Sequence, residues 1–170
     1  MKKLLPLAAL LAVPAHAQDA QVYYASDTWP VHVSGRTCTM AMAAPTADGT
    51  LSVSFDGTRV TLASTSEVES ELPAAGKVNL AIVFLNNGRT EFDDGWGSRE
   101  FTYSRDNGAY RFATRFTGDN NVRQILDDLA ASKTLGLLQR GQTVVAYDLA
   151  DASRSVARLR DCAGRQVAAN

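Results

Sequence analysis

The sequence predicts an α+β fold in which an antiparallel β-meander forms a sandwich or an open barrel, with two short helices in the C-terminal third. Three observations support this prediction. Apolar and polar residues alternate in a series of short segments between residues 29 and 116, which is the period of half-buried strands. Turn-forming Asp-Gly and Asn-Gly pairs separate several of these segments. Apolar residues at helical spacing appear only after residue 118.

The expected strands lie in the first two thirds of the chain. Their ranges are 29–34, 38–42, 51–55, 58–62, 78–85, 101–104 and 110–116. The clearest hairpin turns at an Asp-Gly pair, residues 56–57. A two-residue turn there would set Phe55 opposite Thr58 and Val53 opposite Val60, with all apolar residues of both strands on one face.

The middle of the chain gives two further predictions. Residues 78–85 are apolar on both faces, which is typical of a central strand. An Asn-Gly turn at 107–108 would set Tyr103 opposite Phe112 and Ser104 opposite Arg111. The polar connection 65–76 is compatible with a short exposed helix, and the register of the hairpin around residues 86–97 stays open.

Two helices are expected after these strands. The first has an apolar stripe at i, i+3, i+4, i+7 spacing, preceded by three candidate N-caps. The stripe is Val122, Ile125, Leu126 and Leu129, and the candidate caps are Asp119, Asn120 and Asn121. A short apolar piece, 135–138, and a strand at 142–149 that we interpret as buried follow. The second helix is expected from an N-cap at Ser153 to an end at Gly164, with Cys162 on its apolar stripe.

The first 17 residues have the pattern of a secretory signal peptide. Lys2 and Lys3 are followed by a short apolar run, 4–13, and residues 15–17 offer a small-x-small cleavage site. The run is too short to span a bilayer. We therefore expect a single globular domain, 18–170, that is periplasmic or secreted and has no membrane span.

The charge balance excludes one class of partner. The whole chain has a formal net charge of −1, which becomes −3 once the two lysines of the signal peptide are removed. This is not the basic surface of a nucleic-acid-binding protein. No nucleic-acid partner is expected.

Both cysteines of the chain, Cys38 and Cys162, survive the expected cleavage. An exported protein enters an oxidising compartment, where two free thiols would be unusual. Each cysteine also lies on the apolar side of its expected strand or helix. We therefore predict a structural Cys38–Cys162 disulfide that ties the last helix to the beginning of the fold.

The sequence offers little catalytic chemistry. His32 is the one histidine after the expected cleavage, and it falls on the polar side of its strand. The residues show no metal-ligand spacing and none of the usual nucleophile or phosphate-loop patterns. We expect no cofactor, no metal and no catalytic residues, although two carboxylates alone can hydrolyse a glycoside.

Three residues of one loop are candidates for contact with a partner. Asp93 and Asp94 are adjacent carboxylates in a turn-like setting, which more often marks a solvated turn. Trp96 lies between two glycines, where it can insert into a partner pocket or stack on a sugar. The alternative for Trp96 is to fold back over the open end of the sheet core.

Arg99 is the fourth candidate. It belongs to a group of arginines on one expected hairpin that could receive an anionic ligand; the others are Arg105, Arg111 and Arg115. The alternative is an ordinary solvated face, with Glu100 beside Arg115 and Arg105 over Tyr110.

The layout of the chain resembles the invasion-associated locus B family of small exported bacterial proteins. The resemblance is carried by Trp29 with Cys38-Thr39-Met40 and by residues 149–159. The chain departs from the family in having fewer cysteines and in reading Leu-Pro-Ala-Ala-Gly at 72–76, where the family has a Pro-Gly motif. The resemblance implies a periplasmic or secreted non-enzymatic protein and assigns no catalytic residue.

Together these observations favour an exported, disulfide-stabilised binding or accessory protein whose partner is an unknown protein or glycan. One alternative is an inhibitor of an exported hydrolase that presents residues 93–97. The other is a carboxylate-dependent hydrolase.

Overall fold

The computed structural model describes residues 20–43, 49–66, 72–85, 96–106 and 108–168. Within these ranges the chain forms ten strands and two helices. In chain order they are β1 (Gln21–Tyr24), β2 (Val31–Ser34), β3 (Thr37–Ala41), β4 (Thr50–Phe55), β5 (Arg59–Ser66), β6 (Ala75–Leu85), β7 (Ser98–Asp106), β8 (Ala109–Thr117), α1 (Asp119–Ala131), β9 (Thr134–Gln139), β10 (Gln142–Asp148) and α2 (Ala152–Ala168).

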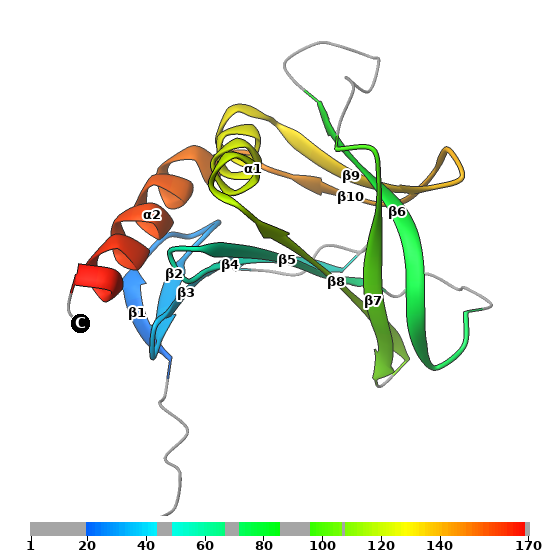
Figure 1. Ribbon diagram of the computed structural model, residues 1–170, viewed down its shortest axis with the longest axis horizontal. Helices are drawn as coiled ribbons and strands as arrows, with labels where there is room; N and C mark the ends of the chain where they lie inside the picture. Colours follow the sequence, from blue (N-terminus) through cyan, green and yellow to red (C-terminus); the bar gives the residue numbers. More distant parts are fainter. Residues whose placement is uncertain (1–19, 44–48, 67–71, 86–95, 107, 169–170) are drawn as a thin grey trace, which may run out of the picture.

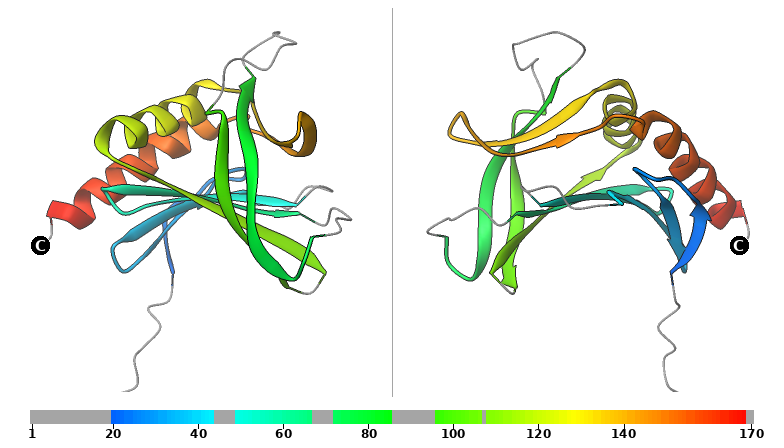
Figure 2. Two further views of the ribbon diagram at one scale, coloured as in Figure 1. Left: turned by 45° about the vertical axis from the view of Figure 1, so that its right-hand side comes forward. Right: turned by 180° about the vertical axis from the view of Figure 1, so that it is seen from behind.

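The ten strands form one sheet in the order β1-β2-β3-β4-β5-β8-β7-β6-β9-β10. Each pair of neighbours in the described sheet is antiparallel. The sheet curls without closing, so β1 and β10 are its two edges (Figure 1). Figure 2 shows β9 and β10 lying across from β4 and β5, with β6 and β7 joining the two parts and the helices on the other side. The predicted α+β class is confirmed, with an open sheet.

The core forms where the inner face of the curled sheet meets the apolar stripes of α1 and α2. Val53, Leu62 and Phe116 are fully buried and come from three neighbouring strands. Ile125 of α1 and Leu159 of α2 are equally buried and complete the core from the helix side. Because side chains alternate along each strand, every second residue points to an outer face, away from this core.

The β4–β5 hairpin has a longer turn than expected. Val53 pairs with Leu62, two residues beyond the predicted partner, so the predicted register was wrong. A shift of two residues keeps each side chain on its face, and alternation alone cannot detect it. Asp56 stabilises the longer turn, since its Oδ1 accepts hydrogen bonds from the Thr58 and Arg59 amides at 2.9 and 2.8 Å. Burial acts to raise the pKa of Asp56, but hydrogen bonds from Thr58 and Arg59 outweigh it and hold the pKa well below its usual range.

The other predicted pairings hold. Tyr103 lies opposite Phe112 and Ser104 opposite Arg111, as expected for the turn between β7 and β8. β6 lies between β7 and β9, which confirms the central position expected of residues 78–85. The hairpin register left open around residues 86–97 is given by β6 and β7, which pair Ala81 with Ser98. Residues 86–95 between the two strands lie outside the described residues.

The polar connection after β5 contains strand rather than helix where the structure describes it. β5 continues to Ser66 and β6 begins at Ala75. These extensions are supported by pairing, because Ser66 lies opposite Tyr110 and Ala75 opposite Ser104. The short exposed helix considered from the sequence is absent from the described parts of 65–76.

Two predictions at the start of the chain were wrong. No strand was predicted before residue 29, but Gln21–Tyr24 form β1, which pairs with β2 and forms one edge of the sheet. Trp29, expected within a strand, lies in the loop before β2, because Pro30 has no N–H to donate to a sheet and β2 begins at Val31. Trp29 is nevertheless buried, and its indole Nε1 donates a hydrogen bond to the Ala150 carbonyl at 3.1 Å.

β9 and β10 form a tight hairpin at the other edge. Arg140 and Gly141 both have positive φ, 51° and 80°, as the preferred two-residue hairpin turn requires. Val145 and Tyr147 are buried on one side of β10, so the interpretation of this strand as buried holds for that face. The other face is not covered: β10 has only β9 beside it, and Ala146 points outward and is exposed.

The apolar stripe predicted for the first helix is buried in α1. The predicted N-caps were wrong, because Gly118 is the N-cap residue and makes no side-chain cap. Asp119 instead begins the first turn, where a negative charge is favoured by the helix dipole.

The second helix is longer than predicted at both ends. α2 begins at Ala152, one residue before the predicted cap Ser153, and runs past Gly164 to Ala168. A helix-interior glycine costs only about 1 kcal/mol. The ion pair between Asp161 and Arg165, at 3.2 Å, spans the Gly164 position and offsets part of that cost.

The predicted disulfide is confirmed. Cys38 of β3 and Cys162 of α2 are bonded, with their Cα atoms 6.1 Å apart, and both residues are fully buried. The Tyr23 hydroxyl of β1 adds a second link to α2, donating to Asp161 Oδ2 at 2.7 Å. These contacts join β1 and β3 to the last helix, and the Trp29–Ala150 hydrogen bond joins the loop before β2 to the loop before α2.

Replacing both cysteines, Cys38→Ala with Cys162→Ala, is expected to lower the free energy of unfolding by roughly 4–5 kcal/mol, the chain-entropy value for a loop this long. The bond spans a sequence separation of 124 residues. Urea unfolding of the variant beside the oxidised and reduced wild type measures the loss. A loss below about 1 kcal/mol would contradict this prediction, because it would show that the packing around the bond stabilises the fold nearly as well without it.

Ser155 of α2 is expected to be a weak point of the core. Its side chain is 1% exposed, and among the described residues its Oγ has no hydrogen-bond partner. An unpaired buried hydroxyl costs about 1–3 kcal/mol. Ser155→Ala should therefore leave stability unchanged or raise it by about 1 kcal/mol in the same urea assay. Exposed Ser153→Ala is the control, and a loss of stability in Ser155→Ala alone would contradict this account.

Candidate functional site

Trp96 packs on the core next to β7. Its backbone N–H donates to the Ile82 carbonyl at 3.0 Å, which continues the pairing of β7 with β6. The half-buried indole meets the ring of Phe116 edge-on, with the ring centroids 4.9 Å apart. Its Nε1 donates to Asp128 Oδ2 of α1 at 2.8 Å. The structure therefore has Trp96 folded onto the sheet core, the second of the two arrangements considered from the sequence.

Arg99 belongs to the same cluster. Its guanidinium carbon lies 4.4 Å from the centroid of the Phe116 ring and 5.8 Å from that of Trp96. Its Nη2 donates to the Arg115 carbonyl at 3.3 Å. Asp93 and Asp94, the other candidates for partner contact, lie outside the described residues.

The four arginines of the β7–β8 hairpin do not form one group. Arg99 lies against Phe116, and Arg105 stacks over Tyr110 at 5.3 Å, as the solvated-face alternative expected. Arg111 and Arg115 point to the outer face of β8. Glu100 pairs with Lys77 of β6 at 2.8 Å.

Asp128 is a site residue that the sequence does not single out, because an Asp-Asp pair on a helix, such as 127–128, is typical of surface charge. Asp127 is such a surface residue and pairs with Arg160 of α2 at 2.6 Å. Asp128 is half-buried, and burial, together with the charge of Asp127, raises its pKa, although the hydrogen bond from Trp96 opposes the change. No signal in the sequence distinguishes the two carboxylates, because the difference depends on where Trp96 lies.

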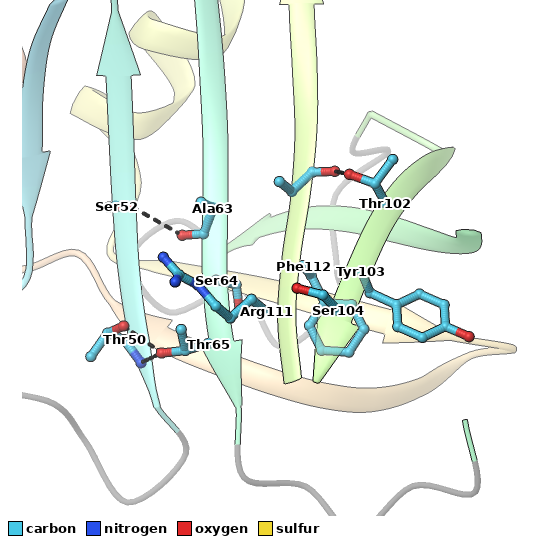
Figure 3. Close-up of a pocket in the computed structure, with 11 residues that line it drawn as sticks. Thr50, Ser52, Ala63, Ser64, Thr65, Thr102, Tyr103, Ser104, Arg111 and Phe112 are labelled. Atoms are coloured by element: carbon cyan, nitrogen blue, oxygen red, sulfur yellow. Dashed lines mark hydrogen bonds between the residues drawn. The ribbon is translucent and has the colours of Figure 1, made fainter. Parts of the chain in front are cut away.

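A hollow of about 380 Å³ opens on the outer face of the sheet, over β4, β5, β8 and β7. Two rungs of paired residues cross it. The first is Ser52, Ala63, Ala113 and Thr102, and the second is Thr50, Thr65, Arg111 and Ser104. Ser64, Tyr103 and Phe112 also border it. Figure 3 shows the Arg111 side chain extending from β8 across β5 toward Thr50 and Ser52.

The hollow forms because small alanine side chains lie between longer polar side chains on the outer face of the sheet. Ala63 and Ala113 lie side by side in the middle of the first rung. The long side chain of Arg111 lies next to them, on the second rung. The alternation in each strand predicted this polar outer face, but not the hollow, because β5 and β8 are neighbours only through a crossover.

The hydroxyl groups around the hollow are already oriented. Thr65 Oγ1 accepts from the Thr50 amide at 3.1 Å and shares a second hydrogen bond with the Thr50 hydroxyl. Thr102 Oγ1 donates to the Ala113 carbonyl at 3.3 Å. A hydroxyl has one hydrogen to donate and two lone pairs, so these groups keep the capacity to accept hydrogen bonds from a ligand.

A second hollow, of about 510 Å³, lies at the start of α2. It is bordered by Asp27, Asp151 and Arg154 together with neutral side chains. Because both carboxylates and a guanidinium line this hollow, it favours neither an anionic nor a cationic ligand. The outer-face hollow has the more defined chemistry.

Two other features are absent from the described ranges. No cluster of three or more His, Cys, Asp or Glu side chains there is arranged to hold a metal ion. The two described helices are also too short or too polar to cross a membrane. Comparison with protein-family models, curated proteins and solved structures finds no match to this chain. The resemblance to the invasion-associated locus B family stays a prediction.

Asp128→Asn is expected to stabilise the protein at pH 7. Asparagine keeps an oxygen for the Trp96 N–H and removes a charge that burial disfavours. Because the folded-state pKa of Asp128 is raised, the wild type gains stability as the pH falls through that pKa toward the ordinary value. The advantage of the variant should therefore be largest at neutral pH and shrink on acidification.

Urea unfolding at several pH values between neutrality and pH 4 measures this trend. Asp128→Ala, which leaves the indole N–H without its partner, is the control and should be about 1 kcal/mol less stable than Asp128→Asn at each pH. An Asn variant as unstable as the Ala variant would show that the carboxylate charge itself holds Trp96 in place.

Proposed function

We propose that the protein is an exported, non-enzymatic binding protein that takes its ligand in the hollow on the outer face of the sheet. The hollow carries this proposal. Its volume of about 380 Å³ lies within the range of small-molecule sites, roughly 300–1,000 Å³. Hydroxyl groups from three strands, a guanidinium and a floor of alanines offer both hydrogen bonds and a flat contact surface.

Export is supported by two features. Residues 1–17 have the pattern of a signal peptide. The Cys38–Cys162 disulfide is compatible with an oxidising compartment.

The two alternatives have less support. The inhibitor hypothesis depended on a Trp96 that projects from its loop, whereas the indole packs on Phe116 and donates its hydrogen bond to Asp128. The hydrolase hypothesis requires a pair of carboxylates, and the residues bordering the hollow in the described chain include none. Both hypotheses stay predictions for residues 93–94.

The proposal is tested by filling the floor of the hollow. In Ala113→Leu the added side chain should occupy the centre of the first rung and weaken binding to glycans by at least about tenfold, as the loss of about 1.4 kcal/mol predicts. The measurement is binding of the purified protein to an array of bacterial and host glycans. Ala146→Leu, at an exposed position on β10, is the matched control and should bind like the wild type.

Equal binding by Ala113→Leu and wild type would contradict the proposed site. Turnover of a bound glycan by the wild type would contradict the non-enzymatic part of the proposal.

A further inference from the structure

The charge of Arg111 is not compensated by any described side chain. No carboxylate in the described ranges pairs with its guanidinium. Lys77 and Glu100 pair with each other at 2.8 Å, so they add no net charge beside the hollow. The described residues that border the hollow carry a single formal charge, the positive charge of Arg111.

A guanidinium in this setting selects a planar oxyanion. Its N–H groups form a fixed fork that fits the two oxygens of a carboxylate in a pair of parallel hydrogen bonds. A single positive charge matches the single negative charge of a carboxylate. A phosphate monoester carries between about −1.5 and −2 at neutral pH and would leave charge unbalanced.

The rest of the hollow fits a polyhydroxyl ring. The hydroxyls of Thr50, Ser52 and Thr65 lie on the side toward which Arg111 extends, and those of Thr102 and Ser104 lie on the other (Figure 3). Ligand hydroxyls can donate to them, since hydroxyl oxygens keep free lone pairs. Ala63 and Ala113, between the two groups, provide an apolar floor for the C–H face of a sugar.

We propose that the hollow binds a sugar that carries a carboxylate, such as the uronic acid unit of an acidic glycan. Arg111 pairs with the carboxylate, the Ser and Thr hydroxyls accept hydrogen bonds from the ring, and the ring lies on Ala63 and Ala113. This assignment rests on the proposed function and names the ligand class of the same site.

Arg115 provides a matched control. It is on the same face of β8, and its Cα is about 13 Å along the strand from that of Arg111. It is exposed and does not border the hollow. Replacing it with glutamine changes the net charge of the protein as much as replacing Arg111 does.

The test is a titration followed by the amide NMR shifts of the disulfide-bonded protein. The probes are glucuronate, galacturonate and mannuronate, their neutral parents glucose, galactose and mannose, and inorganic phosphate. At least one uronate should shift amides of β4, β5, β7 and β8 and bind about tenfold or more tighter than its neutral parent, the value of one charge-assisted pair. Arg111→Gln should abolish this preference without weakening the neutral sugar, whereas Arg115→Gln should keep it.

Several outcomes would overturn the assignment. If neutral sugars bind as well as uronates, and Ala113→Leu removes both, the ligand class is wrong but the proposed site stands. If inorganic phosphate binds the hollow more tightly than each uronate, the ligand is a phosphate. If no sugar shifts the amide resonances of the residues around the hollow, or if Ala113→Leu leaves those shifts unchanged, the assignment and the proposed site fail together.

Discussion

One constraint shapes the structure: a single open sheet must cover its inner face without closing on itself. The ten described strands curl around the core, and the two edge strands, β1 and β10, leave an opening on one side. α1 and α2 fill that opening with their apolar stripes. The cover is held to the beginning of the chain by the disulfide to Cys38, the Tyr23–Asp161 hydrogen bond and the Trp29–Ala150 hydrogen bond. The outer face is left to solvent, and both the hollow and its polar chemistry follow from that division.

Alternation of residues correctly predicted which face of β4, β5 and β8 is buried. Alternation could not determine the register of the β4–β5 hairpin. The strands are shifted by two residues from the predicted pairing because Asp56 stabilises a longer turn. A shift of two residues leaves every side chain on the same face of the sheet. Single-residue signals at helix ends were also weak. Gly164 lies inside α2. The Asp161–Arg165 ion pair and the burial of Ala163 outweigh the cost of a glycine in a helix interior, about 1 kcal/mol.

The site was harder to predict than the fold, because it depends on contacts between distant segments. Ala63 and Ala113 form its floor only because β5 pairs with β8 across the inserted β6 and β7. In the sequence each alanine is a single small residue among the polar residues on the outward side of its strand, and nothing there indicates that the two are neighbours. The same reason separates Asp127 from Asp128: the chain does not reveal that Trp96 lies beside one of them. Cys38 and Cys162 were predictable over a similar distance only because the chain has no other cysteines.

Under the export proposed above, with the N-terminus crossing first, the disulfide also determines an order of events. Cys38 emerges well before Cys162, which follows 124 residues later, so its thiol has no partner in its own chain until α2 has emerged. During that interval the thiol can react only with external oxidants or with other molecules. Oxidation within one chain has a single product, since two cysteines allow one pairing, so no internal rearrangement of disulfides can follow. The bond can therefore close only after both β3 and α2 have emerged.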